Sequence, residues 1–451
     1  MRICVNNWSN RRKINSIFIL ASIVFGVSFG LINYINDDVA LYYRIGNSIR
    51  DFWAYSVEIY DSWSSRIFIN LVWFIVLKSG VRGFALYMAV SMFLLLRGLY
   101  ELMDTDGTAT DVVFVIMVSM LFPFSSLTTA GWIATSTSYF GPQAAGVWAL
   151  VPLKKTLCGE KISNSSFGLY ILAMLYSANA EQMNVALVFC YTVAIVVLAV
   201  KKRFDWRLMV LYLIAIGSMV SMLKCPGNYK RSDMELVDHF PTYKTMDLID
   251  KMDMGLSTTL HWLIVGGNIL FLVICSLLVF EIFQQYTNKI YRIIALFPVV
   301  LCLALGPMAS IVSVVFPQFS MLTQNVDMLG SFTIASSGEG IGMLQFFIFL
   351  CMCLALIVCM LLLNNSVTGL IVDLAVILAG VGSRLMMAFS PSIYASGERT
   401  FTTLAVFFMI FCVMNFGKNK TKFKISVPKF ISALSIIILM SYINLLSIIV
   451  S

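Results

Sequence analysis

Long apolar runs, separated by short polar segments, limit what this sequence can fold into more than any other feature. A helix of about 20 residues crosses the roughly 30 Å of hydrocarbon in a bilayer. Hydrophobic residues make up 59% of the chain and charged residues only 12%, whereas soluble domains carry about 25% charged residues. A soluble globular enzyme is therefore excluded. The sequence predicts an all-α, polytopic helical membrane protein with apolar segments at about 16–35, 67–78, 84–101, 112–126, 138–153, 167–178, 185–200, 207–223, 257–281, 290–306, 343–363, 368–386, 401–416 and 430–450.

Lysine and arginine are concentrated in short segments beside the apolar runs. Loops of this kind remain in the cytoplasm, so we place them and the N-terminus inside, with the first run as an uncleaved anchor. The basic segments are 1–15, 154–161, 201–207, 284–292 and 417–429, and the external ones are then 36–66, 125–137, 179–184, 224–256, 307–342 and 387–400. The pattern is typical of membrane orientation and not of a nucleic-acid-binding surface.

The number of crossings follows from these loop assignments. Three crossings between residues 66 and 125 would put 125–137 inside, whereas the basic loop at 154–161 requires it outside. Either 67–78 or 112–126 therefore fails to cross completely, and we expect about 13 transmembrane helices. No linker or internal repeat divides the chain, so residues 1–451 are expected to form a single membrane domain.

Several kinds of chemistry have no sequence signature here. The chain lacks a Walker A loop, a GxSxG elbow, an HExxH helix and a Rossmann fingerprint. It has no CxxC pair, and its two histidines, His239 and His261, are isolated. Cytosolic nucleotide chemistry and structural zinc are therefore not expected.

The first external segment, 36–66, carries the strongest candidate residues. Asp37 and Asp38 directly follow the first apolar run, and Arg66 precedes the next one. Apolar residues between them recur at helical spacing, which predicts amphipathic helices on the outer membrane surface. A solvated helix end is the structural alternative for the acidic pair. A carboxylate at that position would suit a general base.

The other candidates lie in the remaining external segments. Tyr139 belongs to an aromatic and Gly-Pro cluster at 138–142, for which an interfacial aromatic belt is the alternative. Glu181 lies in a tight turn with three amides, at 177–184. Lys224 and Arg231 flank a Pro-Gly turn that could bind phosphate through charge-assisted hydrogen bonds, and Arg399 lies in 387–400.

External carboxylates and cations together favour one reaction class. Nucleotide sugars are not available outside the cytoplasmic membrane, so a sugar donor there must arrive on a lipid such as a polyprenyl phosphate. Transfer of the sugar needs a base for the acceptor hydroxyl and cations, or a metal, for the leaving phosphate. The sequence leaves open whether a divalent cation takes part.

The order of these motifs resembles the GT-C glycosyltransferase superfamily. The resemblance is to bacterial serotype-converting O-antigen glucosyltransferases and related uncharacterised membrane proteins. It rests on Asn36-Asp37-Asp38, Ser65-Arg66, Trp132 to Pro142, Asn179-Ala180-Glu181-Gln182, Cys225-Pro226-Gly227-Asn228 to Arg231, and Glu398-Arg399. Ala180 and Cys225 depart from the related pattern.

This resemblance implies a fold, an activity and residue roles. It implies a GT-C-like bundle in the bacterial inner membrane that transfers a sugar, glucose by resemblance, from a polyprenyl-phosphate donor. The acceptor would be a lipopolysaccharide O-antigen or another surface glycan, and the transfer would be inverting and periplasmic. By position, the base would be Asp37 or Asp38, Glu181 would bind a sugar, and the lipid phosphate would contact Arg66, Lys224, Arg231 and Arg399.

Two alternatives remain at the level of the sequence. A transporter or flippase of lipid-linked saccharides would also need many helices and cations, but with charged groups on a path to both faces. Asp373, inside an apolar run, is the residue that most favours it. An O-antigen polymerase is the other alternative, and such enzymes rely on large Arg-rich loops, which 224–256 matches less well.

Overall fold

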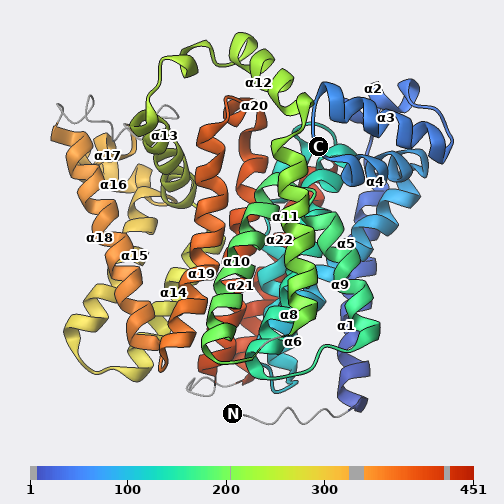
Figure 1. The fold of residues 1–451 in the computed structure, drawn as a ribbon. Coiled ribbons are helices and arrows are strands. Elements are labelled where there is room, and N and C mark those ends of the chain that lie inside the picture. The colour runs from blue at the N-terminus through green and yellow to red at the C-terminus, as the bar shows by residue number, and fades with distance from the viewer. Residues whose placement is uncertain (1–7, 204, 325–339, 421–426, 451) are drawn as a thin grey trace.

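The computed structural model describes residues 8–203, 205–324, 340–420 and 427–450, and in these ranges every regular element is a helix (Figure 1). The predicted all-helical class is confirmed. The helices are α1 (Trp8–Ser28), α2 (Asp37–Arg44), α3 (Ile49–Ser62), α4 (Ile67–Lys78), α5 (Gly80–Leu102), α6 (Ala109–Met120), α7 (Trp132–Thr135), α8 (Gly141–Cys158), α9 (Asn164–Ser177), α10 (Glu181–Val200), α11 (Trp206–Leu223), α12 (Pro226–Asp238), α13 (Leu248–Leu260), α14 (Ile269–Gln285), α15 (Lys289–Leu305), α16 (Ala309–Val315), α17 (Met321–Gln324), α18 (Gly340–Leu363), α19 (Val367–Leu385), α20 (Ile393–Ser396), α21 (Thr402–Asn419) and α22 (Val427–Val450).

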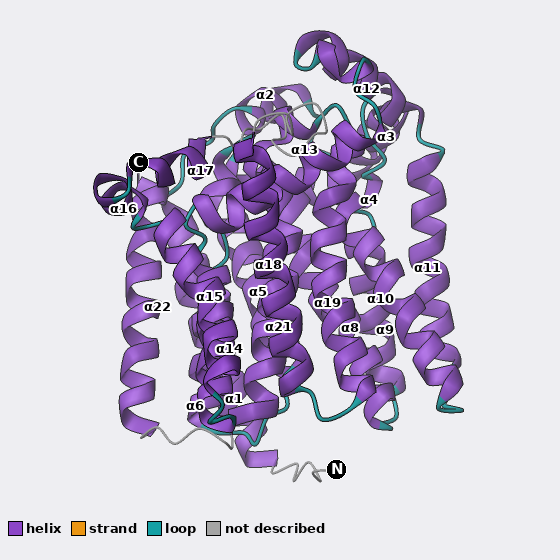
Figure 2. Cartoon of the chain, turned by 90° about the vertical axis from the view of Figure 1, so that its left-hand side faces the viewer, coloured by secondary structure: helices purple, strands orange, loops and turns teal. Residues whose placement is uncertain are grey.

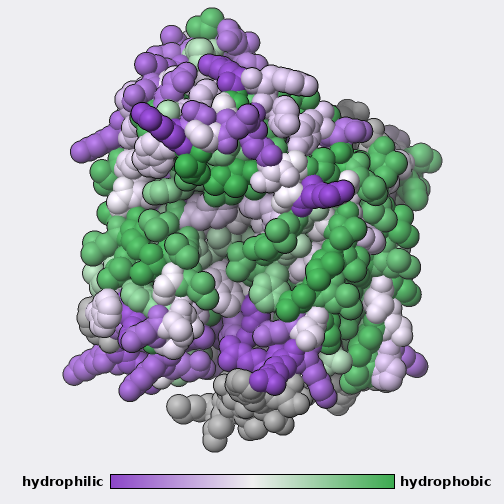
Figure 3. Space-filling model, turned by 90° about the vertical axis from the view of Figure 1, so that its right-hand side faces the viewer, coloured by the Kyte–Doolittle hydropathy of each residue, from purple (hydrophilic) through white to green (hydrophobic). Residues whose placement is uncertain are grey.

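The long helices run side by side and form a multi-pass membrane bundle. Among the described residues, 8 helices are long and apolar enough to span a bilayer, or up to 10 if two bent pairs, α13 with α14 and α15 with α16, each count as one span. In Figure 3 an apolar band covers the middle of the molecule and hydrophilic residues lie above and below it. The expected total of about 13 crossings remains a prediction.

Ion pairs gather at one end of the bundle, which we call the basic end. There Lys154 pairs with Asp104 at 3.1 Å, and Lys418 pairs with Asp373 at 2.5 Å. Lys420 pairs with the buried Asp111 at 2.9 Å. These pairs tie α5, α6, α8, α19 and α21 together where the basic segments predicted from the sequence meet. Segments 1–15 and 417–429 lie partly outside the described residues.

Helix α4 corresponds to 67–78, one of the two segments that the loop charges indicated as candidates for an incomplete crossing of the membrane. Its start lies at the opposite end of the bundle, because Arg66 there pairs with Glu181 at the start of α10. After Ser79 the chain turns at Gly80, where φ is +74°, and α5 runs from there to Glu101 at the basic end, which pairs with Arg11 at the start of α1. Twelve residues of α4 rise about 18 Å. These facts favour 67–78 as the piece that does not cross.

Surface helices cover the opposite end (Figures 1 and 2). The segment 36–66 forms α2 and α3, and α3 begins with a capping box between Ser48 and Asp51. Segment 224–256 is largely helical, although we expected a loop. Pro226 at the first position starts α12, and a capping box between Asp247 and Asp250 starts α13.

Candidate functional site

An ion pair between Arg66 and Glu181 forms the centre of the candidate site. The Arg66 Nη2 lies 2.7 Å from Glu181 Oε2, and Nε donates to the same carboxylate at 2.8 and 3.1 Å. Their side chains are 17% and 20% exposed. Glu181 occupies the first turn of α10, where a carboxylate is favoured by the helix dipole. The pair joins two segments that are 115 residues apart.

Asn179 fixes the start of α4, next to Arg66, against the turn that precedes Glu181. Its Oδ1 accepts hydrogen bonds from the backbone N–H groups of Phe68 and Ile69 at 3.0 and 3.2 Å. These are donors of the first turn of α4, which would otherwise be unsatisfied. Its Nδ2 also donates to Ser65 O at 3.3 Å. Asn179, from the amide-rich turn that also supplies Glu181, therefore caps α4, and it is a positioning residue to which sequence reasoning assigned no separate role.

Tyr139 lies beside this pair. It belongs to a π-helical turn, Ser136–Phe140, between α7 and α8, and is 9% exposed. The guanidinium of Arg66 lies 5.3 Å from the ring centroid, and that of Arg399 lies 5.8 Å from it. Both distances are within the range of a cation–π interaction. Tyr139 thus brings together two arginines that are far apart in the sequence.

Arg231 reaches the same place from α12. A close approach between α12 and the end of α3 sets its position, because a Cβ at Gly227 would lie 2.4 Å from the backbone nitrogen of Trp63. The Cys225 thiol donates to Tyr60 O at 3.0 Å. Burial lowers the pKa of Arg231, and the charge of Glu181 raises it. Arg231 therefore lies within electrostatic range of the Arg66–Glu181 pair.

Arg399 contacts Tyr139 of this cluster and lies within electrostatic range of Asp37. Its side chain is held by two backbone carbonyls, Ser396 O at 2.8 Å from Nε and Ala395 O at 3.0 Å from Nη2. Burial raises the pKa of Asp37, and the positive charge of Arg399 lowers it. Asp37 itself is exposed at the start of α2. The cluster thus has a carboxylate at its edge that is open to the surroundings.

Asp38 has a different environment from its neighbour. It is 0% exposed, and its two oxygens accept hydrogen bonds from the N–H groups of Ile133 and Ala134 at 3.0 and 2.9 Å. Gly131 allows this approach, because its φ is +125° and a Cβ there would lie 2.8 Å from the carboxyl carbon of Asp38. Burial raises the pKa of Asp38 to about 6, although the two N–H groups lower it. Asp38 caps the start of α7.

The remaining predicted residue, Lys224, does not join the cluster. It is exposed at the end of α11, and within the described ranges it makes no ion pair. Arg384, in α19, is 3% exposed and donates to Thr258 Oγ1 at 3.0 Å. Its guanidinium lies 4.3 Å from the Phe401 ring.

The resulting site, which we call the arginine cluster, consists of Arg66, Arg231, Arg399, Tyr139 and Glu181, with Asp37 at its edge. Three guanidinium groups are opposed by two carboxylates, so a positive charge remains to attract an anion. In the described part of the chain, no three His, Cys, Asp or Glu side chains come together in a way that could hold a metal ion.

Comparisons of the chain with models of protein families, with curated proteins and with solved structures find no match.

Proposed function

We propose that the arginine cluster is the active site of a GT-C-type glycosyltransferase. The enzyme would move a sugar, with glucose as the first candidate, from a polyprenyl phosphate to a hydroxyl of a surface glycan such as an O-antigen. The sugar, the acceptor and the periplasmic side come from the family resemblance of the sequence. The observation that supports the reaction class is the convergence of three arginines, from three separate segments, beside one exposed carboxylate.

The arginines fit the leaving group of this reaction. A polyprenyl phosphate gains negative charge when its bond to the sugar breaks, and guanidinium groups bind phosphate oxygens in pairs of hydrogen bonds. Glu181 neutralises and orients Arg66, which leaves Arg231 and Arg399 to face the phosphate. Preorganised charge of this kind is a large contribution to transition-state stabilisation.

Asp37 suits the role of general base better than Asp38. Both oxygens of Asp38 are occupied by backbone N–H groups and none of its surface is exposed. Asp37 is exposed, and its raised pKa makes it a stronger base than an ordinary aspartate. In the proposed step, the acceptor hydroxyl gives its proton to Asp37 and its oxygen attacks C1 of the sugar. The C1–O bond to phosphate breaks, its electron pair leaves with the polyprenyl phosphate, and the anomeric configuration inverts.

The transporter alternative has less support. Asp373, which favoured it, is 1% exposed, pairs with Lys418 and accepts a hydrogen bond from Asn364 at 2.8 Å. A charge that is buried and neutralised in this way ties α19 to α21. It offers no charged group to a transported substrate.

A transfer assay with matched variants tests the proposal. Membranes that contain the full-length protein are supplied with a polyprenyl-phosphate glucose donor and the surface glycan of the host, and sugar incorporation is measured. Asp37→Asn should lower the rate at least 100-fold, because a positioned base contributes about 10²- to 10⁴-fold. Asp233→Asn, which changes an exposed acid on α12, should leave the rate unchanged.

A second measurement in the same assay tests the phosphate role. Arg231→Gln should raise KM for the lipid donor about ten-fold, equivalent to roughly 1.4 kcal/mol, whereas Lys224→Gln should not. Wild-type transfer by the Asp37→Asn variant would refute the base assignment, and equal effects of the two cation variants would refute the arginine cluster as the phosphate site.

A further inference from the structure

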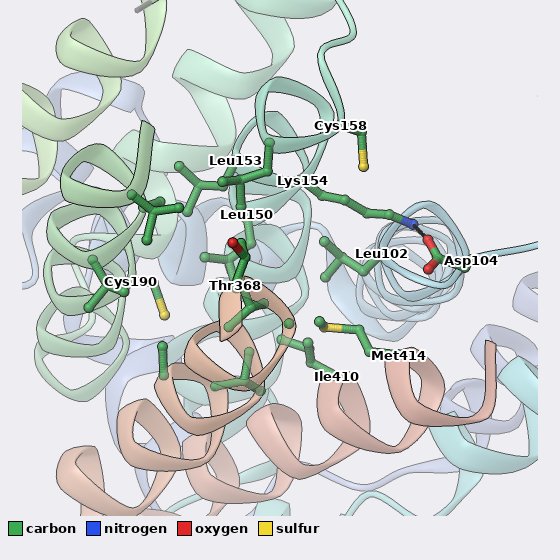
Figure 4. A pocket seen from close by; sticks show the side chains of 18 of the residues that line it. Leu102, Asp104, Leu150, Leu153, Lys154, Cys158, Cys190, Thr368, Ile410 and Met414 are labelled. Atoms are coloured by element: carbon green, nitrogen blue, oxygen red, sulfur yellow. Dashed lines mark ion pairs between the residues drawn. The ribbon is translucent and has the colours of Figure 1, made fainter. Parts of the chain in front are cut away.

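A cavity of about 270 Å³ lies at the basic end, on the opposite side of the bundle from the arginine cluster (Figure 4). It is open to the surface and lined by the ends of α5, α8, α10, α19 and α21. Its walls are almost entirely apolar, with side chains such as Leu150, Leu153, Ala194, Val376, Ile410 and Met414. A cavity of this composition and size suits a hydrocarbon chain and not a sugar.

Lysines gather where this cavity meets the basic end. Lys154, Lys201 and Lys418 line it there, with Asp104 as the exposed acid among them. Figure 4 shows Lys154 extended toward Asp104. Lys418 is paired with the buried Asp373, whereas Lys201 is exposed and makes no ion pair with any described residue. One cation therefore remains available to an anion that sits over the apolar cavity.

The backbone after Lys201 places two further cations, Lys202 and Arg203, at the same end of the bundle, beside a second cavity. Lys202 has a φ of +53°, a conformation that costs a side-chain-bearing residue of the order of 1 kcal/mol and is usually taken by glycine. The hydrogen bonds from Arg203 N to Leu198 O and from Lys202 N to Ala199 O close α10 in this form. Lys202 and Arg203 then line a second cavity of about 300 Å³, between α10 and α11.

We propose that the cavity of about 270 Å³ binds an acyl chain of an anionic phospholipid from the leaflet at the basic end, with the headgroup phosphate at Lys201. Charge complementarity selects this occupant, because basic pockets between membrane helices recognise anionic headgroups. The apolar walls accommodate the chain of the same molecule. The site is separate from the arginine cluster, so the inference stands or falls independently of the proposed enzyme activity.

Native mass spectrometry of the purified full-length protein tests this site. Phosphatidylglycerol and phosphatidylcholine with identical acyl chains are titrated against the wild-type protein and against two variants. We expect tighter binding of one phosphatidylglycerol molecule than of any phosphatidylcholine. Lys201→Ala should weaken that binding about five-fold, the effect of one cation near a membrane surface, and Ala194→Phe should abolish it by filling the cavity.

Two control variants separate site-specific effects from general ones. Lys161→Ala removes an exposed cation at the same end of the bundle, and Val196→Phe enlarges a side chain of α10 that is 59% exposed. Both should bind phosphatidylglycerol as the wild type does. The proposal is overturned if the two phospholipids bind equally, if Lys201→Ala behaves like Lys161→Ala, or if polyprenyl phosphate displaces phosphatidylglycerol at equal concentration.

Discussion

Asp37 and Asp38 are neighbours at the start of α2, yet their carboxylates lie in different environments. Successive residues of a helix point about 100° apart, so one side chain faces outward while the other enters the core against Gly131. The residue before them, Asn36, has a φ of +48°, which is uncommon outside glycine. The sequence marked both residues as candidates for the general base. It could not divide their roles, because the division depends on the backbone of residues 131–134.

The pH dependence of stability separates the buried aspartate from its neighbour. The pKa of Asp38 rises from 3.8 to about 6 in the folded protein, so the folded state holds the proton more tightly than the unfolded chain. Stability should therefore fall as pH rises from about 4 to about 6, by roughly 3 kcal/mol at 1.36 kcal/mol per unit. Asp38→Asn should remove this fall. Thermal unfolding in detergent at pH 4.5 and pH 7 should show about 2 kcal/mol of this fall, because the carboxyl of the unfolded chain is already largely deprotonated at pH 4.5. Asp233→Asn is the control. An Asp38→Asn variant that keeps the wild-type difference contradicts the assignment.

The pH profile of transfer tests the pairing of Asp37 with Arg399. A base works only when deprotonated, so activity should decline as pH falls through the pKa of Asp37. Arg399 lowers that pKa, and Arg399→Gln should move the decline to higher pH, with a lower ratio of activity at pH 5 to activity at pH 8. Arg66→Gln should weaken donor binding without moving the decline. If the activity of both variants declined at the same shifted pH, Arg399 would affect transfer only through donor binding and not through the pKa of Asp37.

At the level of elements, α12 is positioned by contact with α3. The backbone of Gly227 lies so close to residues 60–64 that any side chain would push α12 outward and carry Arg231 with it. Gly227→Ala should therefore raise KM for the lipid donor about 10- to 100-fold, because displacement by an ångström can cost that much. Gly217→Ala, in α11, meets nothing within 4 Å and is the matched control. Equal KM values for the two variants would show that α12 does not position Arg231.

The same elements show what a single sequence could and could not indicate. Apolar periodicity located the long helices, and helical spacing predicted α2 and α3. The helices within 224–256 were missed because charged residues dominate there, although Pro226 and the Asp247–Asp250 spacing are start signals. Contacts such as Asn179 with α4 join segments more than 100 residues apart, and no local pattern encodes them.

For the whole molecule, charge along the sequence predicted the arrangement in space. The basic segments at 154–161 and 201–207 lie together, since Arg203 Nη1 donates to Leu157 O at 3.2 Å. Asp37, Arg66, Glu181, Arg231 and Arg399, drawn from four predicted external segments, meet at the other end. Lys224 was the exception, because a cation beside a turn can face solvent as easily as a site.

The orientation of this bundle in a cell membrane is the last prediction. Lys and Arg in short loops favour the cytoplasm, so the basic end should face inward and the arginine cluster outward. Lys230→Cys on α12 and Lys202→Cys after α10 place exposed thiols at the two ends. In intact bacterial cells a membrane-impermeant maleimide should label Lys230→Cys several-fold above the parent protein and leave Lys202→Cys at the parent level until the cells are lysed. If Lys202→Cys alone were labelled in intact cells, the bundle would have the opposite orientation, with the arginine cluster facing the cytoplasm. An external lipid-linked donor could not then reach it.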